Sequence, residues 1–96
     1  MVLHTLATAP GSAAFENCLA ILSPEDAVLL LGNGVYAGIR RTEAFSRLQA
    51  TGAEINILRE DALAAGLMDR LGSASVIDME GFVILTERYP RQLGWY

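Results

Sequence analysis

The sequence has no lysine, one cysteine and one histidine among its 96 residues. Without lysine, the chain can supply neither the phosphate-binding lysine of a P-loop nor a Schiff-base nucleophile. A single cysteine excludes an internal disulfide, and one histidine with one cysteine offers too few strong ligands for a metal cluster. We therefore expect no metal and no cofactor.

Charge is also scarce, at 19% of the residues against about 25% in an average protein. The formal net charge is −4, and the only adjacent basic pair is Arg40–Arg41, so no nucleic-acid-binding patch is expected. A secretory signal begins with a positively charged region, but no lysine or arginine precedes Arg40. The longest strongly apolar run, Ala27–Leu31, is far shorter than a membrane span. These absences favour a soluble cytoplasmic protein that binds neither nucleic acid nor membrane directly.

Apolar residues, by contrast, are abundant and form 52% of the sequence before its nine glycines are counted. A chain of this length is expected to form a single domain, which we place at residues 1–96. Such a small domain has little interior in which to bury so much apolar material. Part of it is therefore expected to face another subunit.

Short apolar runs alternate with helical patterns along the chain. Ser12 is expected to cap the first helix, and a break is expected near Arg41–Thr42. The alternation predicts an α/β fold: a single three-layer domain with a mainly parallel sheet of about four strands and flanking helices. The expected strands are Val2–Leu6, Ala27–Leu31, Ile55–Leu58 and Ser75–Met79, and the expected helices run approximately over Ser12–Leu22, Val35–Ala50, Glu60–Ala65 and Glu80–Tyr89.

The segment Gly32–Ala37 matches the pattern G-x-G-x-x-A between a strand and a helix. In dinucleotide folds this pattern brings a pyrophosphate to a helix N-terminus. Here the motif follows the second expected strand, and the chain has no room for the second half of such a fold. The acidic residue that binds the ribose in such folds could here only be Glu60 or Asp61. A tight strand-to-helix turn is the simpler interpretation, and a small nucleotide-binding module remains an alternative of another class.

Few other side chains could carry chemistry. His4 lies inside the first expected strand, which indicates a hydrogen-bonded core or interface histidine rather than a catalytic one. The carboxylate pairs Glu25–Asp26 and Glu60–Asp61 flank expected elements, and solvated caps explain them better than general acid–base work. The terminal Trp95–Tyr96 is open to two interpretations, a frayed chain end or an interface contact.

Cys18 is the remaining candidate, because a lone cytosolic cysteine can carry a nucleophilic thiolate. It lies on the apolar face of the first expected helix, several residues past its start, near Glu16 and far from any arginine in sequence. Burial and a nearby carboxylate both raise the pKa of a thiol. The residues alone therefore favour a buried structural thiol over a persulfide carrier.

Taken together, the motifs resemble the DsrH/TusB family over nearly the whole chain. Each motif is weak alone, but their order is specific. The segments that carry the resemblance are Leu3–Leu6, Ala9–Pro10, Val28–Leu31, Asn33–Ala37, Glu60–Leu67, Val76–Met79, Gly81–Val83 and Gln92–Trp95.

The resemblance implies a DsrE-like, flavodoxin-like domain that serves as an accessory, non-catalytic subunit in persulfide transfer. It implies a heterohexamer with TusC/DsrF-like and TusD/DsrE-like subunits, the latter bearing the main sulfur-carrying cysteine. The TusB branch would pass sulfur through a TusE-like acceptor towards 2-thiolation of the tRNA wobble uridine. The DsrH branch would deliver to a DsrC-like acceptor in dissimilatory sulfur oxidation. Cys18 resembles the helix cysteine of DsrH-type members, so a persulfide-carrying role stays open.

Overall fold

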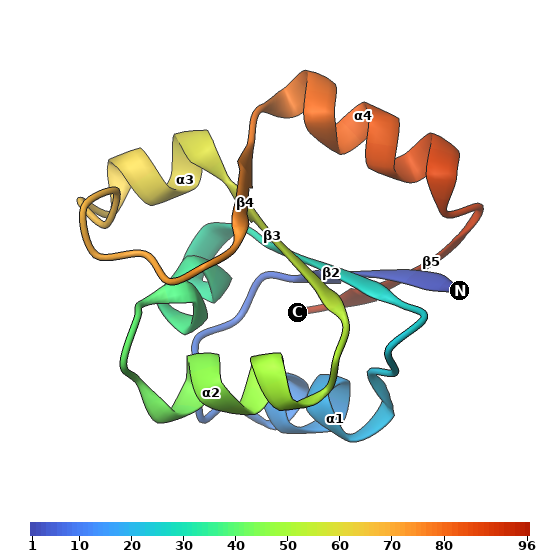
Figure 1. The fold of residues 1–96 in the computed structure, drawn as a ribbon, viewed down its shortest axis with the longest axis horizontal. Helices are drawn as coiled ribbons and strands as arrows, with labels where there is room; N and C mark the ends of the chain where they lie inside the picture. Colours follow the sequence, from blue (N-terminus) through green and yellow to red (C-terminus); the bar gives the residue numbers. More distant parts are fainter.

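In the computed structural model, which describes residues Met1–Tyr96, five strands form one sheet flanked by helices (Figure 1). A short 3₁₀ helix, η1, follows the second strand. In chain order the elements are β1 (Val2–Leu6), α1 (Ala13–Ile21), β2 (Ala27–Leu30), η1 (Gly32–Gly38), α2 (Glu43–Ala50), β3 (Glu54–Leu58), α3 (Arg59–Ala64), β4 (Ser75–Ile77), α4 (Met79–Arg88) and β5 (Arg91–Trp95).

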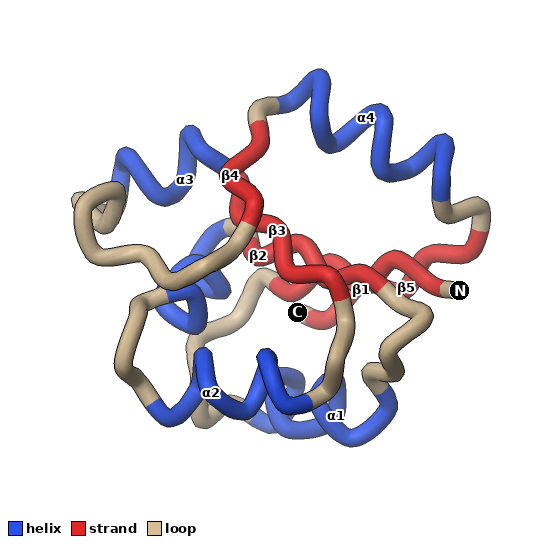
Figure 2. Tube along the Cα trace, viewed as in Figure 1, coloured by secondary structure: helices blue, strands red, loops and turns tan.

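The sheet is parallel throughout, with the strand order β4-β3-β2-β1-β5. From β1 to β4 the chain adds strands on one side only, and α4 then carries it back to the other side of β1. Because parallel connections are right-handed, this reversal requires α4 to lie on the face opposite α1 and α2. Figures 1 and 2 show that arrangement, with α1 and α2 below the sheet and α4 above it.

Three helices begin at side chains that accept a backbone hydrogen bond. Ser12 accepts from the N–H of Phe15, at the start of α1. Thr42 and Asp78 do the same for α2 and α4. Such caps satisfy donors that the first helical turn leaves unpaired, so these boundaries follow directly from local sequence.

Alternating strand side chains divide the interior into two unequal clusters. The larger has 15 buried residues, including Leu6, Val28 and Ile57, and is covered by α1, η1 and α2. The smaller has six, among them Leu3, Leu29 and, from α4, Leu85. No helix combines the length and apolar character that crossing a membrane requires.

The α/β class and parallel sheet are confirmed, and two details differ from expectation. The expected helix at 35–50 is divided as anticipated near Arg41, whose φ is 64°, but its first part is the 3₁₀ helix η1, which ends at Gly38. The sheet has five strands rather than about four, because Arg91–Trp95 forms a fifth. This edge strand pairs only with β1, and its polar and glycine residues lack the apolar pattern of a buried strand.

Candidate functional site

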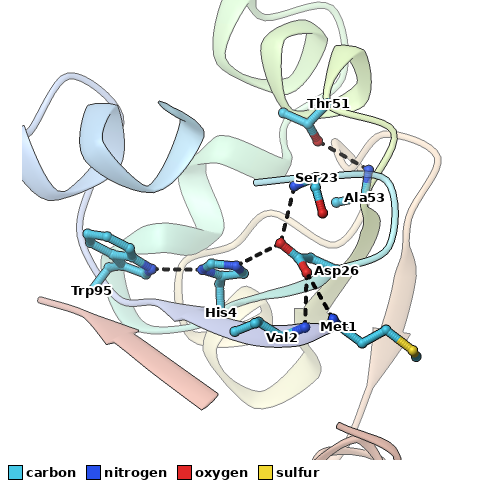
Figure 3. Close-up of polar contacts among 8 residues, drawn as sticks. All are labelled: Met1, Val2, His4, Ser23, Asp26, Thr51, Ala53 and Trp95. Carbon is cyan, nitrogen blue, oxygen red and sulfur yellow. Dashed lines mark hydrogen bonds and ion pairs between the residues drawn. The ribbon is translucent and has the colours of Figure 1, made fainter. Parts of the chain in front are cut away.

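Two of the three buried polar residues, His4 and Asp26, meet beside the strand β1, where His4 also contacts Trp95. Its Nε2 lies 3.1 Å from Asp26 Oδ2, and its Nδ1 accepts a hydrogen bond of 3.0 Å from Trp95 Nε1. The His4 and Trp95 rings also stack, 18° from parallel. Figure 3 shows His4 between the other two side chains, each from a different segment. The predicted hydrogen-bonded core histidine is confirmed, with only 1% of its surface exposed.

The partners of His4 determine where its proton lies. An indole N–H can only donate, so Nδ1 must be the acceptor and Nε2 must carry the hydrogen that Asp26 accepts. Both ring nitrogens are then engaged: Nε2 donates to Asp26, and the single acceptor lone pair, on Nδ1, accepts from the indole and is not free for a substrate. His4 and Asp26 are therefore paired like the histidine and aspartate of a catalytic triad, but this histidine has no free nitrogen to act as the base.

Asp26 is the hub of this network and corrects the expectation of a solvated cap, since it is only 6% exposed. Besides His4, it accepts hydrogen bonds from the N–H groups of Val2 (2.9 Å) and Ser23 (3.2 Å), and the Met1 ammonium lies 4.0 Å away. Burial would raise the pKa of Asp26, but the hydrogen bonds to its charged form outweigh burial and lower the pKa. No local pattern in the sequence signals this role, because Asp26 meets β1 only in the folded sheet.

Cys18 lies at the centre of the larger cluster, with no exposed surface. Burial, followed by the negative charge of Asp26, raises the pKa of the thiol to about 12. At neutral pH the side chain is therefore a thiol rather than the thiolate that attacks sulfur. The negative charge of Asp26 acts on the Cys18 thiol, but the side chain of Cys18 has no surface exposed to solvent.

The Gly32–Ala37 segment lies within the 3₁₀ helix η1, and protein contacts hold it in place. The carboxylate of Asp61 accepts a hydrogen bond of 2.7 Å from the N–H of Gly32, one of the groups that would face a phosphate. A Cβ at Gly34 would lie 2.0 Å from the carbonyl oxygen of Leu6, so glycine is required by the close approach of β1. A shallow pocket of about 270 Å³ beside this turn is lined partly by Asp61, whose charge would repel phosphate.

No group of three or more His, Cys, Asp or Glu side chains converges to hold a metal ion. The geometry thus describes a parallel α/β domain with a buried polar hub, a buried thiol and apolar side chains left on its surface.

Comparisons with known proteins identify the family. The model of the family described as "DsrH like protein" matches residues 8–92. The protein TusB of Pectobacterium parmentieri is 34% identical over 98% of this chain and 100% of its own length. TusB of Yersinia pestis strain Pestoides F is 32% identical over the same shares. The chain belongs to the DsrH-like family, and its assignment as an accessory subunit of sulfur relay in tRNA thiolation is confirmed; membership implies partner proteins in that relay.

A solved structure supports the fold independently. The solution NMR structure of protein Tm0979 from Thermotoga maritima matches with a TM-score of 0.69, over 92% of this chain and 93% of its own. Sequence identity is only 22%, so this likeness concerns the fold alone.

Proposed function

We propose that this chain, as one domain over residues 1–96, is the TusB-like subunit of a cytoplasmic heterohexamer. Its partners would be TusC/DsrF-like and TusD/DsrE-like subunits, and sulfur would leave the complex through a TusE-like acceptor. The observation that carries the proposal is the match to TusB proteins over 98% of this chain and 100% of their own length.

The outer side of α4 supports a role within a complex. Its inner side places Phe82, Leu85 and Tyr89 against the sheet. Its outer side nevertheless carries Met79, Val83 and Ile84, which are 55%, 56% and 55% exposed and line a shallow hollow of about 390 Å³. A helix that is apolar on both sides is expected between two layers of protein, not at a water boundary.

In this proposal Cys18 is a structural residue rather than a required sulfur carrier. Its burial and raised thiol pKa support a structural role, with the sulfur-bearing cysteine on the TusD/DsrE-like partner. Transfer by the assembled complex would then not require sulfur on Cys18.

Capture by partner subunits tests the proposal. The chain is co-expressed with TusC-like and TusD-like proteins, and the complex is measured by sedimentation and by persulfide transfer to the TusE-like acceptor. We expect a stable complex that Val83→Glu abolishes. Leu63→Glu is the matched control, because Leu63 is 58% exposed on α3 and lies away from the α4 surface. If the unsubstituted chain forms no complex, the proposal is refuted. If both variants lose the complex to the same extent, the role of α4 is refuted.

One observation favours a second function in the same family: Cys18 stands in Glu16–Leu19 as the helix cysteine does in DsrH-type members. In that case the complex would deliver sulfur to a DsrC-like acceptor in dissimilatory sulfur oxidation. Parallel transfer assays with the two acceptors separate the branches, since the preferred acceptor should be loaded faster.

A further inference from the structure

Three arginines gather where two connections of the chain meet. The connection before α2 and the connection after α3 form one antiparallel bridge, with Ile39 opposite Leu71. Beside that bridge the N–H of Arg40 donates to the carbonyl of Arg70 across 2.9 Å. Both connections lie at the left of Figure 1, whereas α4 lies at the upper right. The bridge therefore places Arg40 beside Arg70, on a part of the molecule away from α4.

The bridge also determines which way these side chains point. Ile39 and Leu71 pack against the larger buried cluster. Successive residues on paired strands point to opposite sides, so Arg40 and Arg70 point outward together, and both are exposed. Arg41 follows directly and is also exposed, with a φ of 64° that residues other than glycine rarely adopt. We call the exposed group Arg40, Arg41 and Arg70 the arginine surface.

The arginine surface has no acidic partner within the chain. The ion pairs of the other arginines join Arg47 to Glu16, Arg59 to Glu60 and Asp78, and Arg88 to Glu54. Glu43 and Asp69, the acids nearest in sequence, form no ion pair with the surface, and Arg40 donates only to the backbone carbonyl of Asp69. Arg91 is the one other unpaired arginine. Because the chain has 11 acidic residues and seven arginines, a shortage of acids does not explain the unpaired group.

This arrangement has a cost that no contact within the domain offsets. Like charges directly opposite each other on paired strands are destabilising, and a left-handed backbone at Arg41 adds to that cost. The side chain of Arg70 makes no hydrogen bond or ion pair in return. A bound anion would remove the repulsion, since guanidinium groups bind carboxylates through paired, charge-assisted hydrogen bonds.

We propose that the arginine surface is a docking site for an acidic segment of a partner protein. Carboxylates spaced along a peptide can pair with the three guanidinium groups separately. A nucleic acid is a poorer match, because its continuous phosphate backbone would extend onto a chain whose net charge is −4. The proposal goes beyond the proposed function, since the surface lies apart from α4 and its occupation requires no persulfide.

Binding of a fluorescein-labelled hexaglutamate peptide to the full chain tests this proposal. At an ionic strength of about 20 mM, fluorescence anisotropy should give a Kd below about 1 mM, and about 0.3 M salt should weaken the binding strongly. In ¹⁵N NMR spectra the peptide should shift the amide signals of Gly38 and Gly72, which lie beside the bridge. Labelled hexauridylate RNA is the comparison probe. No peptide binding, or tighter binding of the RNA, would overturn the proposal.

Substitutions separate the arginine surface from the net charge of the chain. Arg70→Gln should raise the Kd of the peptide about three- to fivefold, and Arg40→Gln combined with it about tenfold. Arg91→Gln is the matched control, because it removes the same charge from an exposed, unpaired arginine on β5, and its Kd should change less than about 1.5-fold.

A further variant guards against loss of binding through unfolding. Arg41→Gly removes a charge and relieves the backbone at a φ of 64°, so it should weaken peptide binding without lowering the melting temperature. If the double variant does not fold, Arg70→Gln and Arg41→Gly decide. Equal losses with Arg70→Gln and Arg91→Gln would show an effect of net charge alone and would overturn the proposal.

Discussion

The two faces of the sheet are built differently, although they share the same five strands. The face under α1, η1 and α2 buries 15 clustered residues, including the thiol of Cys18. The face under α4 buries six and is covered by that one helix, whose outer side is itself apolar. The difference indicates that the first face supplies most of the stability of the isolated chain, whereas the second face, under the proposed function, is the one that a partner subunit covers.

The largest expected effect is at Gly34, where the covered face meets the end of β1. Gly34→Ala should destabilise the domain by about 4 kcal/mol or more, because its Cβ would lie 2.0 Å from the Leu6 carbonyl oxygen. Gly11→Ala is the control: its φ is +91° but nothing lies within 4 Å, so about 1 kcal/mol is expected. Urea unfolding measures both, and equal losses would contradict the packing described for Gly34.

A pair of leucines compares the two faces directly. Leu48 on α2 and Leu85 on α4 are 0% and 3% exposed. Leu48→Ala should cost about 4 kcal/mol, and Leu85→Ala about 2–3 kcal/mol, because a single covering helix can settle into the space left behind. Chemical denaturation of the isolated chain gives both values. A larger loss at Leu85 would reverse the assignment of the stability-bearing face.

Replacing the buried carboxylate of Asp26 should lower the free energy of unfolding somewhat less than Leu48→Ala does. Asp26→Asn should destabilise by about 3 kcal/mol at pH 7, because the amide group cannot accept from all of His4, Val2 and Ser23. A carboxyl whose pKa is lowered by folding contributes stability above its unfolded value of about 3.9 and loses it as the pH falls through the folded pKa. The unsubstituted protein should therefore lose stability below about pH 4, and the variant should lose less there. Parallel pH profiles would contradict this.

Replacing the buried thiol of Cys18 tests whether this residue takes part in persulfide transfer. Cys18→Ser should cost about 2 kcal/mol, since its hydroxyl would be buried without a designed partner, while persulfide transfer by the assembled complex stays nearly unchanged. The raised pKa of about 12 also predicts slow thiol labelling at neutral pH. Cys18→Ala separates lost packing from lost chemistry. Rapid labelling of the native complex, together with loss of transfer in both variants, would make Cys18 a carrier.

The smallest effect on stability is expected on the outer side of α4. Ile84→Gln should change the free energy of unfolding by less than about 0.5 kcal/mol, because the side chain is 55% exposed. The same change should weaken assembly with the partner subunits, measured by sedimentation of the mixture. A clear loss of stability in the isolated chain would show that α4 does not have a free outer side.

The local sequence was sufficient wherever an element depends on its own residues. Ser12 as a cap, the break at Arg41–Thr42 and the burial of Cys18 on an apolar helix face were all predicted and are confirmed. The fifth strand was missed because β5 is held by backbone hydrogen bonds to β1, which begins 89 residues earlier if counted from Val2 to Arg91. The frayed-end interpretation is wrong for Trp95, because its indole donates to His4 within the same domain, while the interface interpretation of the C-terminal aromatic residues stays a prediction.

The sequence by itself determined the α/β class, the family and the surplus of apolar residues, because periodicity, caps and ordered motifs are properties of neighbouring residues. Only the tertiary structure decided the strand order, the face on which the surplus lies and the hydrogen-bond partners of the lone histidine. Those depend on contacts between distant segments: His4 acquires its tautomer from Asp26 and Trp95, 22 and 91 residues away. The side chain alone could have been an acid, a base or a ligand. Its two partners make it a hydrogen-bonding centre that joins β1 to Asp26 and to Trp95.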